Sequence, residues 1–192
     1  MTPSILTSGG TYFHFLDTER SAIDIETIAH ALAHICRFTG HTATFYSVAQ
    51  HSVLVSRLVP PEHALTGLLH DAAEAYLGDV AAPLKMLLPD YKAIEATVEA
   101  AVLGRFGLPA TLPPNVKQAD RLALAIEQRA LMPMHGDVWD CELHPDYDRF
   151  KAQMVIFPAP PVVARKLFMA RFWELLQAPH ISSECVTDWS AA

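Results

Sequence analysis

The stretch Leu68–Tyr76 places three polar side chains suited to metal binding or proton transfer among leucines and alanines. His70 and Glu74 are four residues apart, so they share one face of a helix, and the adjacent Asp71 can converge with His70 on an ion. The apolar neighbours predict burial, and a buried carboxylate is costly unless it is paired or coordinates a metal. The same neighbours disfavour the alternative, an ordinary His–Glu pair on a solvated helix face.

Two more ligand candidates stand on separate predicted helices. His51 interrupts the apolar pattern of Ser47–Leu54, and Asp120 interrupts that of Val116–Leu124. Taken alone, each is more often a hydrogen-bonded core histidine or a surface aspartate than a metal ligand. The chain order His, His-Asp, Asp over three helices makes a shared site the better interpretation.

This order of residues resembles the HD superfamily of metal-dependent phosphohydrolases over about residues 25–132. Within that superfamily, the chain is similar to small bacterial and phage 5′-deoxynucleotidases and to the related triphosphohydrolases that act on dATP. The resemblance is carried by His70–Asp79 with the following Pro83–Lys85, and by the pair Arg37-Phe38, fourteen residues before His51. It implies an HD-domain fold in which the metal is bound by His51, His70, Asp71 and Asp120.

Two imidazoles and two carboxylates form a mixed nitrogen–oxygen site, which suits a divalent transition metal such as Mn²⁺, Fe²⁺, Co²⁺, Ni²⁺ or Zn²⁺. Four protein ligands leave positions for water, whose pKa the metal lowers while it polarises a phosphoryl oxygen. A single His-Asp pair predicts one metal ion. His30 and His41 are the candidates for a second ion, although their spacing does not require it.

The resemblance also assigns catalytic roles. It makes Glu74 the residue that orients or deprotonates the attacking water. Asp79, which follows Gly78 at the predicted helix end, is the candidate to protonate the leaving oxygen or to hold the sugar. The alternative for Asp79 is a loop residue that caps the next turn.

Phosphate binding in an acidic chain requires local cations. Arg37 is the first choice, because a planar guanidinium can grip two phosphate oxygens. Lys85 is the second, with a solvated surface lysine as its alternative, and His41 is the third. Phe38 either stacks on a base or belongs to the core, where phenylalanine is common.

Composition supports a single domain over residues 1–192. The chain is 51% hydrophobic and carries a formal net charge of −7 without a run of lysine or arginine, so duplex nucleic acid is not an expected partner. Only 18% of the residues are charged, which predicts broadly apolar helices and a homodimer or higher homo-oligomer. Three cysteines without a C-x-x-C pair exclude a zinc knuckle, and the sequence shows neither a signal peptide nor a membrane span, which favours a cytoplasmic protein.

The predicted class is all-α, a compact orthogonal bundle after a short extended segment or hairpin near residues 11–15. Asp24 caps the first helix, and Pro113-Pro114 opens a long one. A turn follows Pro83, residues 133–145 are irregular, the helices within 145–177 complete the bundle, and the polar tail after Pro179 is frayed. Trp139 and Trp173 are assigned to core or interface packing. The predicted helices are 25–38, 44–58, 61–77, 91–106, 113–131, 147–154 and 161–176.

The function expected from these features is hydrolysis of (deoxy)nucleoside 5′-monophosphates, with metal-activated water attacking phosphorus. A dATP-type triphosphohydrolase is the first alternative, because the cations Arg37, Lys85 and His41, with Lys117 or Arg121, permit either substrate. A cyclic-nucleotide or alarmone hydrolase is a further alternative within the superfamily. A non-catalytic HD-fold protein that senses a nucleotide is the alternative of another class, and retention of all four ligands with Glu74 argues against it.

Overall fold

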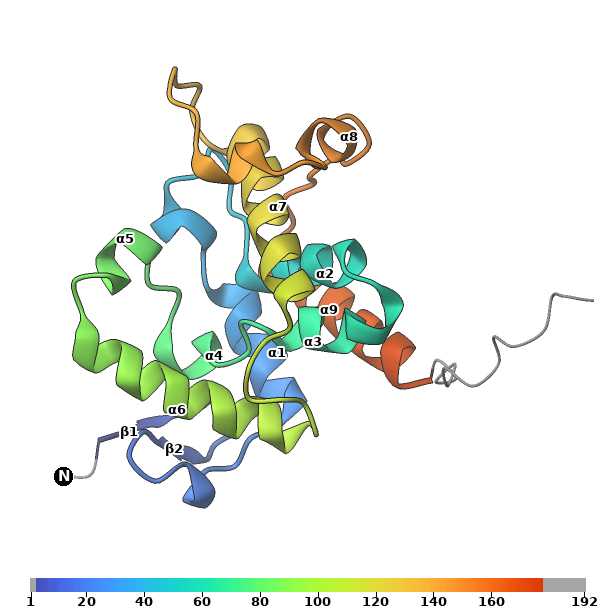
Figure 1. The fold of residues 1–192 in the computed structure, drawn as a ribbon. Coiled ribbons are helices and arrows are strands. Elements are labelled where there is room, and N and C mark those ends of the chain that lie inside the picture. The colour runs from blue at the N-terminus through green and yellow to red at the C-terminus, as the bar shows by residue number, and fades with distance from the viewer. Residues whose placement is uncertain (1–2, 178–192) are drawn as a thin grey trace, which may run out of the picture.

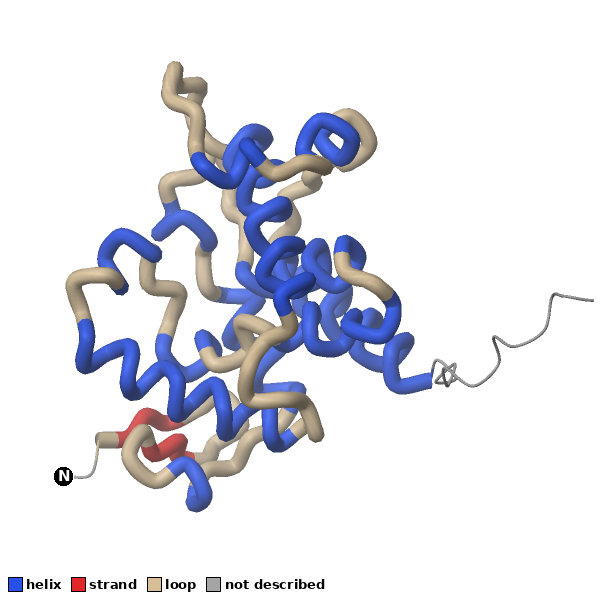
Figure 2. Tube along the Cα trace, viewed as in Figure 1, coloured by secondary structure: helices blue, strands red, loops and turns tan. Residues whose placement is uncertain are grey.

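A computed structural model describes residues 3–177 of the chain, and these residues fold mostly into helices (Figures 1 and 2). This confirms the predicted mostly helical class, whereas membership in the HD-domain fold stays a prediction. No helix in the described part of the chain combines the length and hydropathy needed to cross a membrane.

The predicted hairpin forms at the N-terminus. Strand β1 (Ser4–Leu6) pairs antiparallel with β2 (Tyr12–His14), with Ser4 opposite His14, and both lie beside α6 in Figure 1. Phe13 is fully buried, and its ring stacks on that of Tyr76 with 4.0 Å between centroids. Phe13 therefore anchors the hairpin to the core, and Ile5 and Phe15 pack against the same cluster.

Helix α1 (Ile25–His34) begins as predicted, because the Asp24 carboxylate accepts a hydrogen bond from the Thr27 amide. It ends four residues before the predicted end at Phe38, so that part of the prediction is wrong. Ile35 is already extended, and the next segment forms a single turn, η2 (Arg37–Gly40). In place of the last turn of the predicted helix, the Arg37 amide donates to the Tyr46 carbonyl oxygen and the Val48 amide donates to the Ile35 carbonyl oxygen.

Helix α2 (Val48–Leu58) starts at the Ser47 cap rather than at Thr44 and is buried along most of its length. It packs against α1, α3, α7 and α9, so it lies at the centre of the bundle. Large side chains buried around it come from several elements. They include Ile28, Leu32, Leu68, Leu103 and Phe168.

The predicted continuous helix over residues 61–77 is wrong, because the structure divides it. A short turn η3 (Pro61–His63) leads into α3 (Ala64–Leu69), and α4 (Glu74–Leu77) follows after four residues in turns. Between them the amides of Ala72 and Glu74 donate to carbonyls three residues back, at 3.0 Å each. This tighter winding replaces the α-helical bonds at the His70-Asp71 pair.

The remaining elements follow the predicted order. Proline opens three of them, as its fixed φ allows at a helix start. Helix α7 carries the long predicted segment, and α9 closes the bundle against α1, α2 and α3. The elements are η1 (Thr18–Arg20), α5 (Ala82–Lys85), α6 (Pro89–Arg105), α7 (Pro114–Leu131), η4 (Asp140–Leu143), α8 (Tyr147–Lys151) and α9 (Pro161–Gln177). The tail predicted to fray after Pro179 lies outside the described residues.

Candidate metal centre

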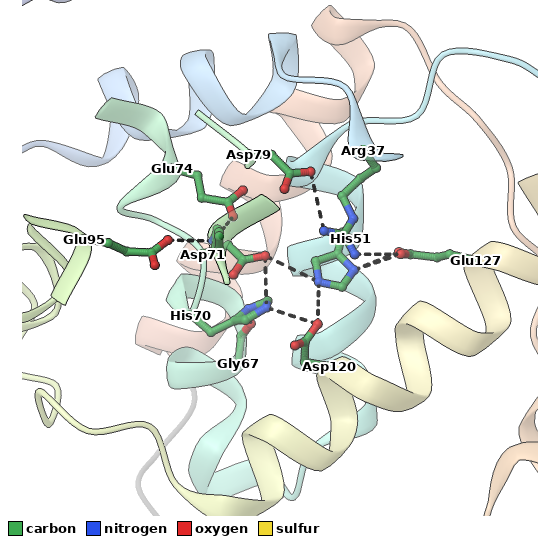
Figure 3. A network of polar contacts seen from close by, with 11 residues as sticks. Arg37, His51, Gly67, His70, Asp71, Glu74, Asp79, Glu95, Asp120 and Glu127 are labelled. Carbon is green, nitrogen blue, oxygen red and sulfur yellow. Dashed lines mark hydrogen bonds and ion pairs between the residues drawn. The ribbon is translucent and has the colours of Figure 1, made fainter. Parts of the chain in front are cut away.

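Two histidines and two aspartates point toward one another where α2, α7 and the turn between α3 and α4 meet (Figure 3). His51 Nε2 lies 3.1 Å from Asp120 Oδ1 and 3.5 Å from Asp71 Oδ2. His70 Nε2 lies 3.2 Å from Asp71 Oδ2 and 3.8 Å from Asp120 Oδ1. The fold thus brings together all four residues that the sequence nominates as metal ligands.

The donor set fits a metal ion. Ligand atoms of His51, His70 and Asp120 lie within 4.8 Å of one another, and both histidines are buried. Among the described residues, His51 Nε2 and His70 Nε2 face these aspartate oxygens, but none of the contacts has hydrogen-bond geometry. A cation placed between them would bind the nitrogen lone pairs and the aspartate oxygens together, which satisfies both kinds of buried group. This group could therefore hold a metal ion.

The opposite ring nitrogens are held by protein groups. His51 Nδ1 lies 2.9 and 3.0 Å from the two carboxylate oxygens of Glu127, and His70 Nδ1 lies 2.9 Å from the Gly67 carbonyl oxygen. When each Nδ1–H donates to these oxygens, each Nε2 keeps its lone pair directed at the site. The tautomer that a metal requires is therefore favoured by the surrounding fold.

Glu127 is a site residue that the sequence analysis missed. Its side chain is completely buried, and it contacts Arg37 and Tyr46 in addition to His51. Burial raises the pKa of this carboxyl, but His51 and Arg37 outweigh burial and lower it below its usual value. A signal was present, because Glu127 stands two helical turns after Asp120 in an apolar stretch of α7.

The carboxylates and imidazoles of the site also shift one another's pKa values. Burial lowers the pKa of His70, but Asp71 and Asp120 outweigh it and hold that pKa well above the ordinary value. Burial raises the pKa of Asp71, yet His70 brings it down to about 2. The aspartates therefore stay ionised, and any cation that binds here competes with protons on the two histidines.

Arg37 reaches the site from outside any long helix. Its Nη2 lies 3.4 Å from Glu127 Oε2, and its Nη1 lies 3.6 Å from Asp79 Oδ2. Burial lowers the pKa of the guanidinium, but Glu127, Asp71 and Asp79 raise it further above its ordinary value. Because α1 ends at His34, the predicted placement of Arg37 at a helix C-terminus is wrong.

Glu74 and Lys85 form a second pair beside the ligands. Glu74 is buried, Lys85 Nζ lies 3.8 Å from its Oε1, and among the described residues its Oε2 has no hydrogen-bond partner. Burial, with Asp71 and Asp79 nearby, raises the pKa of Glu74 well above its ordinary value. Lys85 Nζ also lies 2.6 Å from Glu95 Oε1 on α6.

The two ion pairs of Lys85 show that the alternative of a solvated surface lysine is wrong. Its partner Glu95 was not among the residues predicted from the sequence.

Asp79 follows Gly78, whose φ of +80° turns the chain back toward the ligands. Burial raises the pKa of this carboxyl, although Arg37 opposes that shift. Figure 3 shows Asp79 on the same side of the site as Glu74, so both candidate acid–base residues face the region above the ligands.

A cavity of about 500 Å³ joins these side chains, and all four predicted substrate-contact residues line it: Arg37, Phe38, His41 and Lys85. The polar part of the wall also includes Asp71, Glu74, Asp79 and Asp120, and the apolar part includes Val80, Pro83, Leu124, Met132 and Trp139. His30 does not belong here. It lines a different cavity, and its ring lies 4.3 Å from that of His34 at an interplanar angle of 32°, so it is not placed beside the four ligands.

The fold and the site define a mostly helical protein with a buried His/His/Asp group able to hold a metal ion. No model of a known protein family matches the chain. The chain is 44% identical to the uncharacterized protein YfdR of Escherichia coli K12 over 172 residues, which is 89% of this chain and 94% of YfdR. It is 34% identical to an uncharacterized protein of Rhodobacter capsulatus over 183 residues, which is 88% of this chain and 93% of that protein. The chain therefore belongs to the family of YfdR.

Proposed function

We propose that this protein is a metal-dependent phosphohydrolase of the HD superfamily that acts on (deoxy)nucleoside 5′-monophosphates. The observation that carries the proposal is the convergence of the Nε2 atoms of His51 and His70 on Asp71 and Asp120 at the wall of a nucleotide-sized cavity. One divalent transition metal would be held by His51, His70, Asp71 and Asp120. It would supply the Lewis-acid chemistry of phosphoester hydrolysis.

The surrounding carboxylates supply proton transfer. Glu74 lines the cavity with an unpartnered oxygen, and its raised pKa makes it a stronger base than an exposed glutamate. It can orient the attacking water and take its proton. Asp79, whose pKa is also raised, is the group that can return a proton to the leaving oxygen or hold the sugar.

The charges around the cavity favour a monophosphate over a triphosphate. Arg37 already contacts Glu127 and Asp79, and Lys85 already contacts Glu74 and Glu95. Among the described residues that line the cavity, no other lysine or arginine is present. Arg121 lines a different cavity beside the Asp140 carbonyl oxygen, and Lys117 is exposed and does not line this one. Beyond these two cations, which are already paired, a β- and a γ-phosphate would find only His41 in the wall of the cavity, against four carboxylates.

The test is phosphate release from a panel of nucleotides with added Mn²⁺ or Co²⁺, in which orthophosphate is separated from triphosphate. We expect orthophosphate from 5′-monophosphates. Triphosphate release from dATP would favour the triphosphohydrolase, and hydrolysis of cyclic or alarmone substrates would favour those activities. Nucleotide binding without release of any phosphate product, with metal present, would favour the non-catalytic sensor.

A further inference from the structure

We infer that Trp139 and Phe38 form the surface of the cavity on which a planar aromatic base stacks, and that Trp139 is a specificity-determining residue. The inference rests on the proposed function. If the phosphate of a nucleotide lies at the metal centre, its base lies in the part of the cavity that Phe38 and Trp139 line. The inference assigns Trp139 a binding role in place of the packing role predicted from the sequence.

The backbone around Phe38 is strained. Phe38 and Thr39 both have a φ of 54°, in the left-handed region that few residues other than glycine adopt and that β-branched threonine strongly disfavours. Such strain persists only where the surroundings enforce it, and it is common at ligand sites. Here it accompanies a Phe38 ring that lines the cavity instead of joining any cluster of the described hydrophobic core. The core alternative for Phe38 is therefore wrong.

Trp139 is held in place from behind. Its amide donates to Glu142 Oε1 at 2.9 Å, and the ring packs on the small hydrophobic cluster of α7 and η4. His135 stacks on the indole with 5.7 Å between centroids and an interplanar angle of 27°. His135 lines a separate cavity of about 150 Å³, whereas Trp139 lines the larger one. Met132 lines both cavities, and the indole is supported by protein on the side of His135.

The rings of Phe38 and Trp139 are inclined to each other and form a corner, instead of lying parallel with a gap between them. Their centroids are 6.5 Å apart and their planes are inclined by 52°, so a base cannot insert between them in parallel. It can stack on one ring while its edge meets the other, an arrangement that aromatic pairs favour. Leu124 and Met132 extend the apolar surface. A sugar phosphate without a base has no flat apolar face to cover this corner, whereas a nucleobase has one.

The test compares two substrates, deoxyadenosine 5′-monophosphate and the base-free deoxyribose 5-phosphate, with Mn²⁺ or Co²⁺ present. We expect Trp139→Ala to lower the ratio of their kcat/KM values about ten-fold, as loss of one base-stacking contact predicts, mainly through KM for the nucleotide. Trp139→Phe should retain most of the ratio. The matched control is Trp173→Ala, because Trp173 is half exposed on α9, packs on Phe172 and does not line the cavity. It should leave the ratio unchanged.

A second measurement separates this inference from the proposed function. Binding of deoxyadenosine, which has no phosphate, is measured by calorimetry on metal-free protein. If the wild type binds the nucleoside and Trp139→Ala binds it about ten-fold more weakly, the base surface stands even if no phosphate ester is hydrolysed. If Trp139→Ala and Trp139→Phe both keep the wild-type ratio and affinity, the inference is overturned while the proposed hydrolysis can stand. If Trp139→Ala fails to fold, Trp139→Phe and Trp139→Leu decide, because only the leucine should lower the ratio.

Discussion

In the part of the chain that the structure describes, the metal centre and a segment of α1 both bring histidines near carboxylates, and of these two only the first has the properties of a metal centre. The first is the group of His51, His70, Asp71 and Asp120. The second lies along α1, where the rings of His30 and His34 are in contact and His30 lines a separate cavity with Glu26 and Arg165. The residue types are nearly the same, so composition alone does not distinguish the two regions.

The two regions differ in the burial of their histidines and in what the ring nitrogens of these histidines face. At the metal centre, both Nε2 atoms are buried and face the aspartate oxygens, while Glu127 and Gly67 hold the opposite ring nitrogens. On α1, His34 Nδ1 contacts the His30 carbonyl oxygen, and the Glu26–Arg165 pair is exposed, so solvent screens its charges. A cation would find converging ligand atoms in the first region, whereas the histidines on α1 belong to no such group among the described residues.

The largest expected effect comes from removing a ligand. His51→Ala and His70→Ala should each abolish bound metal and phosphate release, because each removes one of the buried nitrogens. Asp71→Ala and Asp120→Ala should do the same by removing a carboxylate. Metal content by elemental analysis and turnover with Mn²⁺ measure this. His30→Ala is the matched control from the second region, and a loss of metal in that variant would contradict the comparison.

Glu74→Gln should keep the metal and the fold but lower turnover about a hundred-fold or more, since an amide cannot accept the proton of the attacking water. The measurement is kcat at saturating metal, with metal content determined on the same sample. Glu62→Gln, at an exposed position on η3, serves as the control. Unchanged turnover in Glu74→Gln would leave Glu74 with a structural role only, and loss of metal would place it among the ligands.

Glu127→Gln should weaken metal binding about ten- to a hundred-fold, the usual effect of removing a carboxylate that orients a histidine ligand. The measurement is a competition titration with a metal chelator. Glu26→Gln removes a carboxylate from the exposed pair on α1 and should leave the metal affinity unchanged. Equal affinities in Glu127→Gln and the wild type would mean that Glu127 supports only the packing of α7.

The smallest effect concerns stability and pH in metal-free protein. The pKa of Glu74 is raised in the folded state, so the folded state binds more protons than the unfolded state, and stability is lost as pH rises through the folded pKa. Glu74→Gln removes this buried carboxylate, so its melting temperature should exceed that of the wild type at pH 8. The difference should shrink as the pH falls toward the ordinary pKa of glutamate. Thermal melts at several pH values would show it, and a constant difference would contradict the assignment.

The sequence by itself determined the local features. The Asp24 cap, the proline start of α7 and the hairpin near Phe13 follow from neighbouring residues, and the structure has them where they were expected. The nomination of His51, His70, Asp71 and Asp120 also needed only residue type and helical periodicity. Helix caps, helix starts and helical periodicity depend on residues close together in the chain, so they can be predicted from a single sequence.

Only the tertiary structure decided which distant groups meet. Glu127 lies against His51 across 76 residues of chain, and Lys85 lies against Glu95 on α6. Trp139 reaches the same cavity as Phe38 from the segment after α7. No local sequence pattern predicts these contacts between distant residues, because they depend on how the buried helices pack against one another. The tertiary structure also interrupts the predicted helix at His70-Asp71. It places Arg37 in ion pairs with Asp79 and Glu127.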